Sequence, residues 1–303
     1  QDISYEDKLD RLYTKAYEHL YVNKDSCYFY FKQIEQTAIE EKDWLNVIEA
    51  LISANRNAGT FYDLHTLKRN LTQLDSLFVT HKSYVDSLPE KRVLVNSFLY
   101  DKGNYYFKLG DFENARSSFL KIKDSLEVLP KSVLDGDLVD LLSAAYSFLA
   151  KMNADEGQYE LAKQFYNKNI RFLQKERPDD QETLNTNYSL LAEVYGKEKK
   201  YQKSILQFKK ALSHYLDNGT SSNGVISTAH NIALNYILLA QTDSAQKYLG
   251  VAENYLNQNH NFNAQHYRIK AKLSASKLDS TIAFKHLDMA LHLDQIRRSQ
   301  VKN

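Results

Sequence analysis

The chain has 303 residues, and 43% of them are hydrophobic, which is enough to build a core. Its 39 Lys and Arg residues against 38 Asp and Glu leave a formal net charge of +1, so no global field favours a nucleic acid or an anionic membrane as partner. The single cysteine, Cys27, excludes an intrachain disulfide and a cysteine-based zinc site. The sequence contains no run of about 18 apolar residues, the length needed to span a bilayer.

The sequence predicts a series of helix pairs, and the first two of them are the least regular. The stretch KDSCYFYFKQI places Cys27 among aromatic side chains, at a position that small residues occupy in later pairs. We therefore interpret Cys27 as a core residue and not as a nucleophile. A divergent second pair, with Leu67, Leu71 and Leu74, fits the interval that follows.

The third helix pair carries the clearest pattern, in the stretch KLGDFENARSSF at residues 108–119. Gly110 is expected to end the first helix by adopting the left-handed conformation. Ala115 is expected to let the two helices approach closely, and Phe119, one turn later, to fill the space beside it. The stretch therefore predicts a helix, a tight turn and a second helix.

Four further copies of this pattern follow. They are EGQYELAKQFYNKNI, KKYQKSILQFKKAL, QTDSAQKYLGVA and LDSTIAFKHLDMAL. From Ala115 onward, the small residues Ala162, Ser204, Ala245 and Ala283 follow at intervals of 47, 42, 41 and 38 residues. The three prolines, at positions 89, 130 and 178, all fall between predicted pairs, where a helix must stop. A period of about 40 residues with few glycines and prolines predicts an all-α array.

These stretches resemble tetratricopeptide repeats, in the longer-period variety of kinesin light chains and many bacterial regulators. The resemblance implies one domain over residues 1–303, an all-α right-handed superhelical solenoid of about seven helix pairs. The expected units span residues 4–41, 43–80, 91–129, 136–175, 180–217, 223–257 and 262–300. The sequence as a whole also resembles the N-terminal arrays of bacterial proteins with a CHAT-type protease domain or a sensor kinase.

No catalytic, cofactor or metal site is expected. The stretch GTSSNGVI has the two glycines of a phosphate loop, Gly219 and Gly224, but Val225 stands where the lysine belongs, so we interpret it as a turn between repeats. The closest histidine pairs are six residues apart, which places them on different helix faces. We therefore expect no enzymatic activity, no cofactor and no metal.

The resemblance implies that the first helix of each unit lines a concave groove that binds a peptide or a partner helix. Carried over by position, the candidate groove residues are Tyr100, Asn104, Lys108, Ser147, Lys151, Ser189, Glu193, Lys197, Ser227, His230, Arg268 and Lys272. Asn104 matches the asparagine with which chaperone-binding relatives hold a peptide backbone, whereas Tyr100 replaces the lysine of their carboxylate clamp. Because most charged members of the set are Lys or Arg, the expected partner is an acidic segment.

Two functions are compatible with the sequence. The first is an interaction scaffold that binds a segment of another protein or of its own chain. The alternative is the regulatory or sensor half of a larger enzyme or signalling protein whose effector domain lies beyond residue 303. Gln1 in place of Met fits either a processed N-terminus or a chosen fragment boundary, so both a cytoplasmic and a periplasmic or secreted location are open.

Overall fold

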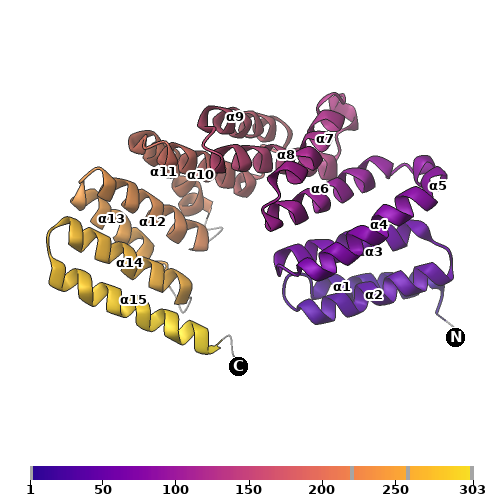
Figure 1. The fold of residues 1–303 in the computed structure, drawn as a ribbon, viewed down its shortest axis with the longest axis horizontal. Coiled ribbons are helices and arrows are strands. Elements are labelled where there is room, and N and C mark those ends of the chain that lie inside the picture. Colours follow the sequence, from indigo (N-terminus) through magenta and orange to yellow (C-terminus); the bar gives the residue numbers. More distant parts are fainter. Residues whose placement is uncertain (1–2, 219–221, 257–259, 301–303) are drawn as a thin grey trace. The chain divides into compact units, whose positions relative to one another are not determined.

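The computed structural model describes residues 3–218, 222–256 and 260–300, and within these ranges it contains α-helices, one short 3₁₀ helix and no strand (Figure 1). The helices pack in consecutive pairs along the chain. The all-α fold class expected from the sequence is therefore confirmed. The contacts divide the chain into two compact units, residues 1–149 and 150–303, which we describe separately.

The first unit contains seven helices, the 3₁₀ helix and most of an eighth helix that continues past residue 149. Their bounds are α1 Tyr5–Glu18, α2 Lys24–Glu40, α3 Trp44–Thr60, α4 Leu64–Thr80, α5 Lys82–Ser87, α6 Lys91–Leu109, α7 Phe112–Glu127, the 3₁₀ helix Lys131–Val133 and α8 Gly136–Asp155. The short α5 links α4 to α6 and was not expected from the sequence. Its Val85 is buried in the core formed around α3, α4 and α6.

The second unit continues with antiparallel pairs of similar length. Their bounds are α9 Tyr159–Glu176, α10 Gln181–Lys197, α11 Tyr201–Asn218, α12 Ser222–Leu238, α13 Thr242–Glu253, α14 His260–Ser276 and α15 Ser280–Gln300. Gly219 lies outside the described residues. Gly224, which we assigned to a turn, lies inside α12, where a β-carbon would stand 2.8 Å from the ring of Tyr215. That assignment was wrong, because the glycine serves close packing between α11 and α12.

A single turn type joins most of the helices. Gly110, at φ 77°, and Gly157, at φ 79°, adopt the left-handed conformation expected of a residue that ends a helix. In each case the following residue donates its backbone N–H to a carbonyl five positions back, as Asp111 does to Tyr106 at 2.9 Å. The Asp111 side chain then accepts from the N–H of Asn114 and caps α7. The chain therefore reverses within two residues.

The small residue and the aromatic residue after it occupy the places expected of them. Ala115 and Phe119 are fully buried on α7, and a β-carbon at Gly103 of α6 would lie 2.8 Å from the Phe119 ring. Cys27 is also fully buried, and burial raises the pKa of its thiol to about 11. These contacts confirm the interpretation of Ala115, Phe119 and Cys27 as packing residues.

Among the described residues, no helix is both long and apolar enough to cross a membrane. The same part of the chain contains no group of three or more His, Cys, Asp or Glu side chains that could hold a metal ion.

Candidate ligand cavity of the first unit

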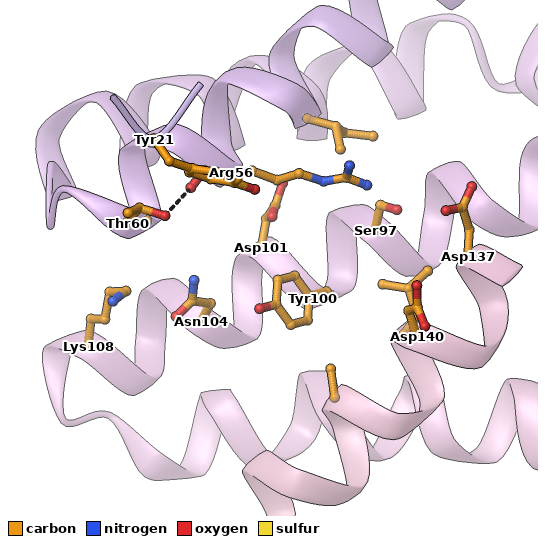
Figure 2. Close-up of a pocket in the computed structure, with 14 residues that line it drawn as sticks. Tyr21, Arg56, Thr60, Ser97, Tyr100, Asp101, Asn104, Lys108, Asp137 and Asp140 are labelled. Carbon is orange, nitrogen blue, oxygen red and sulfur yellow. Dashed lines mark hydrogen bonds between the residues drawn. The ribbon is translucent and has the colours of Figure 1, made fainter. Parts of the chain in front are cut away.

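A cavity of about 550 Å³ opens in the first unit between α3, α6 and the beginning of α8 (Figure 2). One stripe of α6 forms its floor, because residues three, four, seven and eleven positions apart lie on the same face of a helix. The stripe consists of Ser97, Tyr100, Asp101, Asn104 and Lys108. Three of the candidate groove residues, Tyr100, Asn104 and Lys108, therefore line one cavity.

Tyr100 forms an aromatic wall of the cavity. Its ring makes edge contacts with Phe119, at 6.2 Å between centroids, and with Phe148, at 6.0 Å. Burial raises the pKa of the Tyr100 phenol to about 12, so the group is neutral at physiological pH. A ring held on two sides by other aromatic side chains presents a fixed surface to a ligand.

Asn104 lies against α3 because position 59 has no side chain. A β-carbon at Gly59 would stand 3.0 Å from the Asn104 amide nitrogen. Asn104 is half-buried, and its amide can both donate to a carbonyl and accept from an N–H of a bound backbone. Gly59 therefore determines where this amide sits.

Lys108 marks the C-terminal end of the α6 stripe. Its ammonium group lies 3.6 Å from the centroid of the Tyr62 ring, a distance that favours a cation–π interaction. Tyr62 belongs to the turn between α3 and α4 and has φ 55°. The positive charge at this end of the cavity thus lies against a side chain of the turn between α3 and α4.

Asp101 is the most deeply buried charged group of the cavity, with 3% of its surface exposed. It accepts a hydrogen bond of 2.9 Å from the Nδ2 of Asn55 on α3, which is itself 1% exposed. Burial raises the pKa of the Asp101 carboxyl to about 7, against opposing effects of this hydrogen bond and of Arg56. Near neutral pH the carboxyl therefore exists in both its charged and its neutral form.

The acidic residues of the cavity gather at the end opposite Lys108. Asp137 and Asp140, from the first turns of α8, lie near Ser97, while Asn104 and Lys108 lie at the other end of the stripe (Figure 2). Arg56 extends from α3 toward the Asp137 side. The lining thus carries three carboxyl groups and two cations: Asp137, Asp140 and the Arg56 guanidinium lie toward one end, Lys108 lies at the other, and Asp101 lies between them.

Three of the predicted residues in the second unit come together in a much smaller recess. Lys151, Glu193 and Lys197 line a space of about 20 Å³ together with Asp155. The Lys197 ammonium pairs with Asp155 at 2.5 Å, and burial raises the pKa of Glu193. A recess of this size holds about one water molecule. The charged groups around it interact with one another, and the recess has no room for a peptide.

The remaining predicted residues do not converge. Ser147 is half-buried, the hydroxyl oxygen of Ser189 is inaccessible to solvent, and Ser227 and Lys272 are exposed. His230 is only 3% exposed, and its Nε2 lies 3.0 Å from Nδ1 of His266. Arg268 pairs with Asp294 of α15.

Sequence reasoning missed the walls that α3 and α8 contribute. Arg56 lies on α3, where no groove residue was expected, and Asp137 and Asp140 lie on α8 ahead of its expected groove residues, Ser147 and Lys151. Asp101 was the one accessible signal, because it directly follows the apolar run FLY of a helix that packs on both neighbours, where a carboxyl is unusual.

Comparison with known protein families gives a match to one helix pair. A family model described as tetratricopeptide repeat matches residues 97–124, which are most of α6 and α7. Comparison of the sequence with curated proteins gives no match.

Solved structures resemble the fold over most of the chain. The apo form of RapI is 14% identical, with a TM-score of 0.70 over 95% of this chain and 76% of that chain. BtubC (BKLC) from P. vanneervenii is 19% identical, with a TM-score of 0.62 over 77% of this chain and 92% of that chain. The apo form of the quorum sensor NprR from B. thuringiensis is 14% identical, with a TM-score of 0.58 over 95% and 75%. At these identities the likeness concerns the fold alone.

Proposed function

We propose that the chain, whose fold resembles that of tetratricopeptide-repeat proteins, is an interaction scaffold whose first unit binds a protein segment in the cavity between α3, α6 and α8. The single observation that carries the proposal is the cavity itself. Its volume of about 550 Å³ falls within the range of ligand sites, and an aromatic ring, an amide and charges of both signs line it.

The length of the α6 stripe suggests how much of a partner fits. From Ser97 to Lys108 the stripe is about 16 Å long at 1.5 Å per residue, which matches about five residues of extended chain. Tyr100 would contact side chains of the segment, and the Asn104 amide would hold its backbone. Neither role requires a catalytic group, and we propose no enzymatic activity for the chain.

A net acidic partner is not favoured by this cavity. Lys108 and Arg56 could attract a carboxylate, but Asp101, Asp137 and Asp140 outnumber them. The acidic segment expected from the sequence therefore fits only the Lys108 end. We propose a segment that carries both signs of charge.

A second candidate function is the sensor arm of a larger regulatory protein. The likeness to the quorum sensor NprR, which extends over 95% of this chain, favours it. In that case the bound segment acts as the signal. The cavity and the experiment that tests it are the same for both candidates.

The proposal is tested by selecting peptides on the purified protein from a display library of random seven-residue segments. Selected peptides should bind with Kd values in the micromolar range or below, and Tyr100→Ala and Asn104→Ala should weaken them at least tenfold. Lys121→Glu, on the exposed face of α7, is the matched control and should leave binding unchanged. Selection of no peptide, or equal effects of all three changes, would contradict segment binding in this cavity.

The predicted residues of the second unit are tested with the same peptides. If Lys151 and Lys197 contribute to binding, the double variant Lys151→Glu with Lys197→Glu weakens it. If the proposal is right that the first-unit cavity is the site, the double variant leaves the Kd unchanged.

A further inference from the structure

We infer that Asp101, positioned by a hydrogen bond from Asn55, forms a subsite for the guanidinium group of an arginine side chain in the bound segment. The inference rests on the proposed function, since it names the chemical group that such a segment presents to the floor of the cavity.

The first observation is a buried carboxyl group with unused acceptor capacity. Within the described part of the chain, Asp101 accepts one hydrogen bond, at Oδ2, and Asn55 Oδ1 is buried without any donor. Both residues lie almost entirely out of water, with 3% and 1% of their surfaces exposed, and Asp101 lines the cavity. Buried acceptors without a donor are costly, so a ligand that supplies donors there gains affinity.

The second observation is the kind of donor that fits. Asn55 itself does not line the cavity, and the hydrogen bond from its Nδ2 to Oδ2 of Asp101 holds the carboxyl group at the cavity wall. A guanidinium presents several N–H groups in one plane and can donate two of them to a single carboxylate. It also brings the positive charge that a buried carboxylate lacks.

Arg56, the neighbouring cation of the protein, does not fill this role. No ion pair joins Arg56 to Asp101 among the described residues, and the Arg56 side chain is exposed. Consecutive positions on a helix point in different directions, so Arg56 leaves α3 on another side from Asn55. In Figure 2 its guanidinium extends toward Asp137.

Protonation of Asp101 competes with the cation. The carboxyl can take up a proton when no cation is present, and its pKa near 7 is consistent with that exchange. The charged and titratable groups around it are Arg56 from α3, Tyr100 and Lys108 from α6, Asp137 and Asp140 from α8, and Tyr21 before α2. Since guanidinium keeps its charge throughout, affinity should fall about tenfold between pH 8 and pH 6.

The test uses two probes that differ in one group. N-acetyl-L-arginine methylamide carries the guanidinium without a free terminus, and the citrulline analogue replaces it with a neutral urea of the same shape. By ligand-observed NMR or calorimetry, we expect the arginine probe to bind with a millimolar or better Kd at pH 8. The citrulline probe should bind at least tenfold more weakly.

Asp101→Asn should reduce binding of the arginine probe at least tenfold and abolish its dependence on pH. Asp75→Asn is the matched control, because Asp75 lies on α4, pairs with Lys102 and does not line the cavity. Since asparagine has the shape of aspartate and removes a buried charge, Asp101→Asn should fold. Equal binding by the two probes, unchanged binding by Asp101→Asn, or no binding of the arginine probe by the wild type would overturn the subsite.

The two proposals fail in different ways. If the library selects peptides that lack arginine and bind independently of Asp101, segment binding stands and the guanidinium subsite falls. If the arginine probe binds through Asp101 and the library selects nothing, the subsite stands and segment binding falls.

Discussion

At the scale of single residues, Gly103 sets the distance between α6 and α7. Gly103→Ala would place a β-carbon 2.8 Å from the Phe119 ring, which stacks on Phe148 at 4.5 Å and has little room to move. We expect the free energy of unfolding in urea to fall by about 1 to 3 kcal/mol, despite the higher helix propensity of alanine. Gly250→Ala is the control, because nothing lies within 4 Å of its added carbon, and it should stabilise α13 by up to about 1 kcal/mol. Equal stability of the two variants would contradict the packing role.

Asp101 should lower the stability of the fold as the pH rises. Its pKa is raised from 3.8 to about 7, so between these values the folded state holds a proton that the unfolded state has released. The stability that this group contributes is fully present below about pH 4, falls progressively as the pH rises toward 7, and is lost above that pH. Asp101→Asn should therefore gain on the order of 3 kcal/mol over the wild type at pH 8 and little at pH 4, measured by denaturant unfolding. A gain that does not change with pH would show that Asp101 is not the titrating group.

Gly59→Ala separates stability from binding at one position. The added carbon meets the Asn104 amide at 3.0 Å, so the side chain must shift while α3 gains helix propensity. The melting temperature should change by no more than a few degrees, whereas affinity for the selected peptides should fall about as far as in Asn104→Ala. Unchanged affinity would show that the position of this amide does not matter for binding.

At the scale of helices and turns, the same reversal occurs where the sequence shows no glycine. Lys42, Tyr62, Lys199, Ala240 and Leu278 have φ between 55° and 61°, like Gly110 and Gly157 in their own turns. The residue after each donates to a carbonyl five positions back. Tertiary packing thus imposes the left-handed conformation on residues that disfavour it, and a search for glycine could find only two of these turns.

The site was predictable on one helix and not on its neighbours. The resemblance to the repeat family grouped Tyr100, Asn104 and Lys108, and their spacing of four residues places them on one face of α6. The distance from α6 to α3 depends on Gly59 and on the turn at Tyr62, which no pattern in the sequence marked. His230 shows the converse, because a polar residue at a cavity-type position packs against His266 instead.

The buried contact between α12 and α14 should make the fold sensitive to acid. Burial lowers the pKa of both His230 and His266 to about 4, and their rings lie 3.0 Å apart at the nearest nitrogens. Below pH 6.5 the unfolded state binds more protons than the folded state, so stability falls as the pH drops from about 6.5 toward 4. His230→Gln should flatten the dependence of the melting temperature on pH between 7.5 and 4.5. His65→Gln, on the exposed face of α4, is the control and should reproduce the wild-type slope.

At the scale of the whole molecule, the repeat pattern predicts that residues 1–303 unfold as one solenoid. The division into two compact units suggests instead that each unit could unfold by itself. In arrays of repeats, stability is approximately a sum of terms within repeats and between neighbours, so damage can remain local. The chain offers a direct reporter, because its single tryptophan, Trp44, lies in the first unit and stacks on His81 with 4.0 Å between ring centroids. Its fluorescence therefore follows the first unit, whereas circular dichroism follows all helices.

We predict that Ala211→Leu separates the two signals. Ala211 is fully buried in the core of the second unit, and a larger side chain there should cost about 1 to 3 kcal/mol through overpacking. The dichroism transition in urea should move to lower concentration and broaden, while the Trp44 transition keeps the wild-type midpoint. Ala58→Leu, in the core that contains Trp44, should instead shift the fluorescence midpoint. If Ala211→Leu moved both transitions equally, the two units would unfold together, as the single cooperative solenoid that the repeats predict.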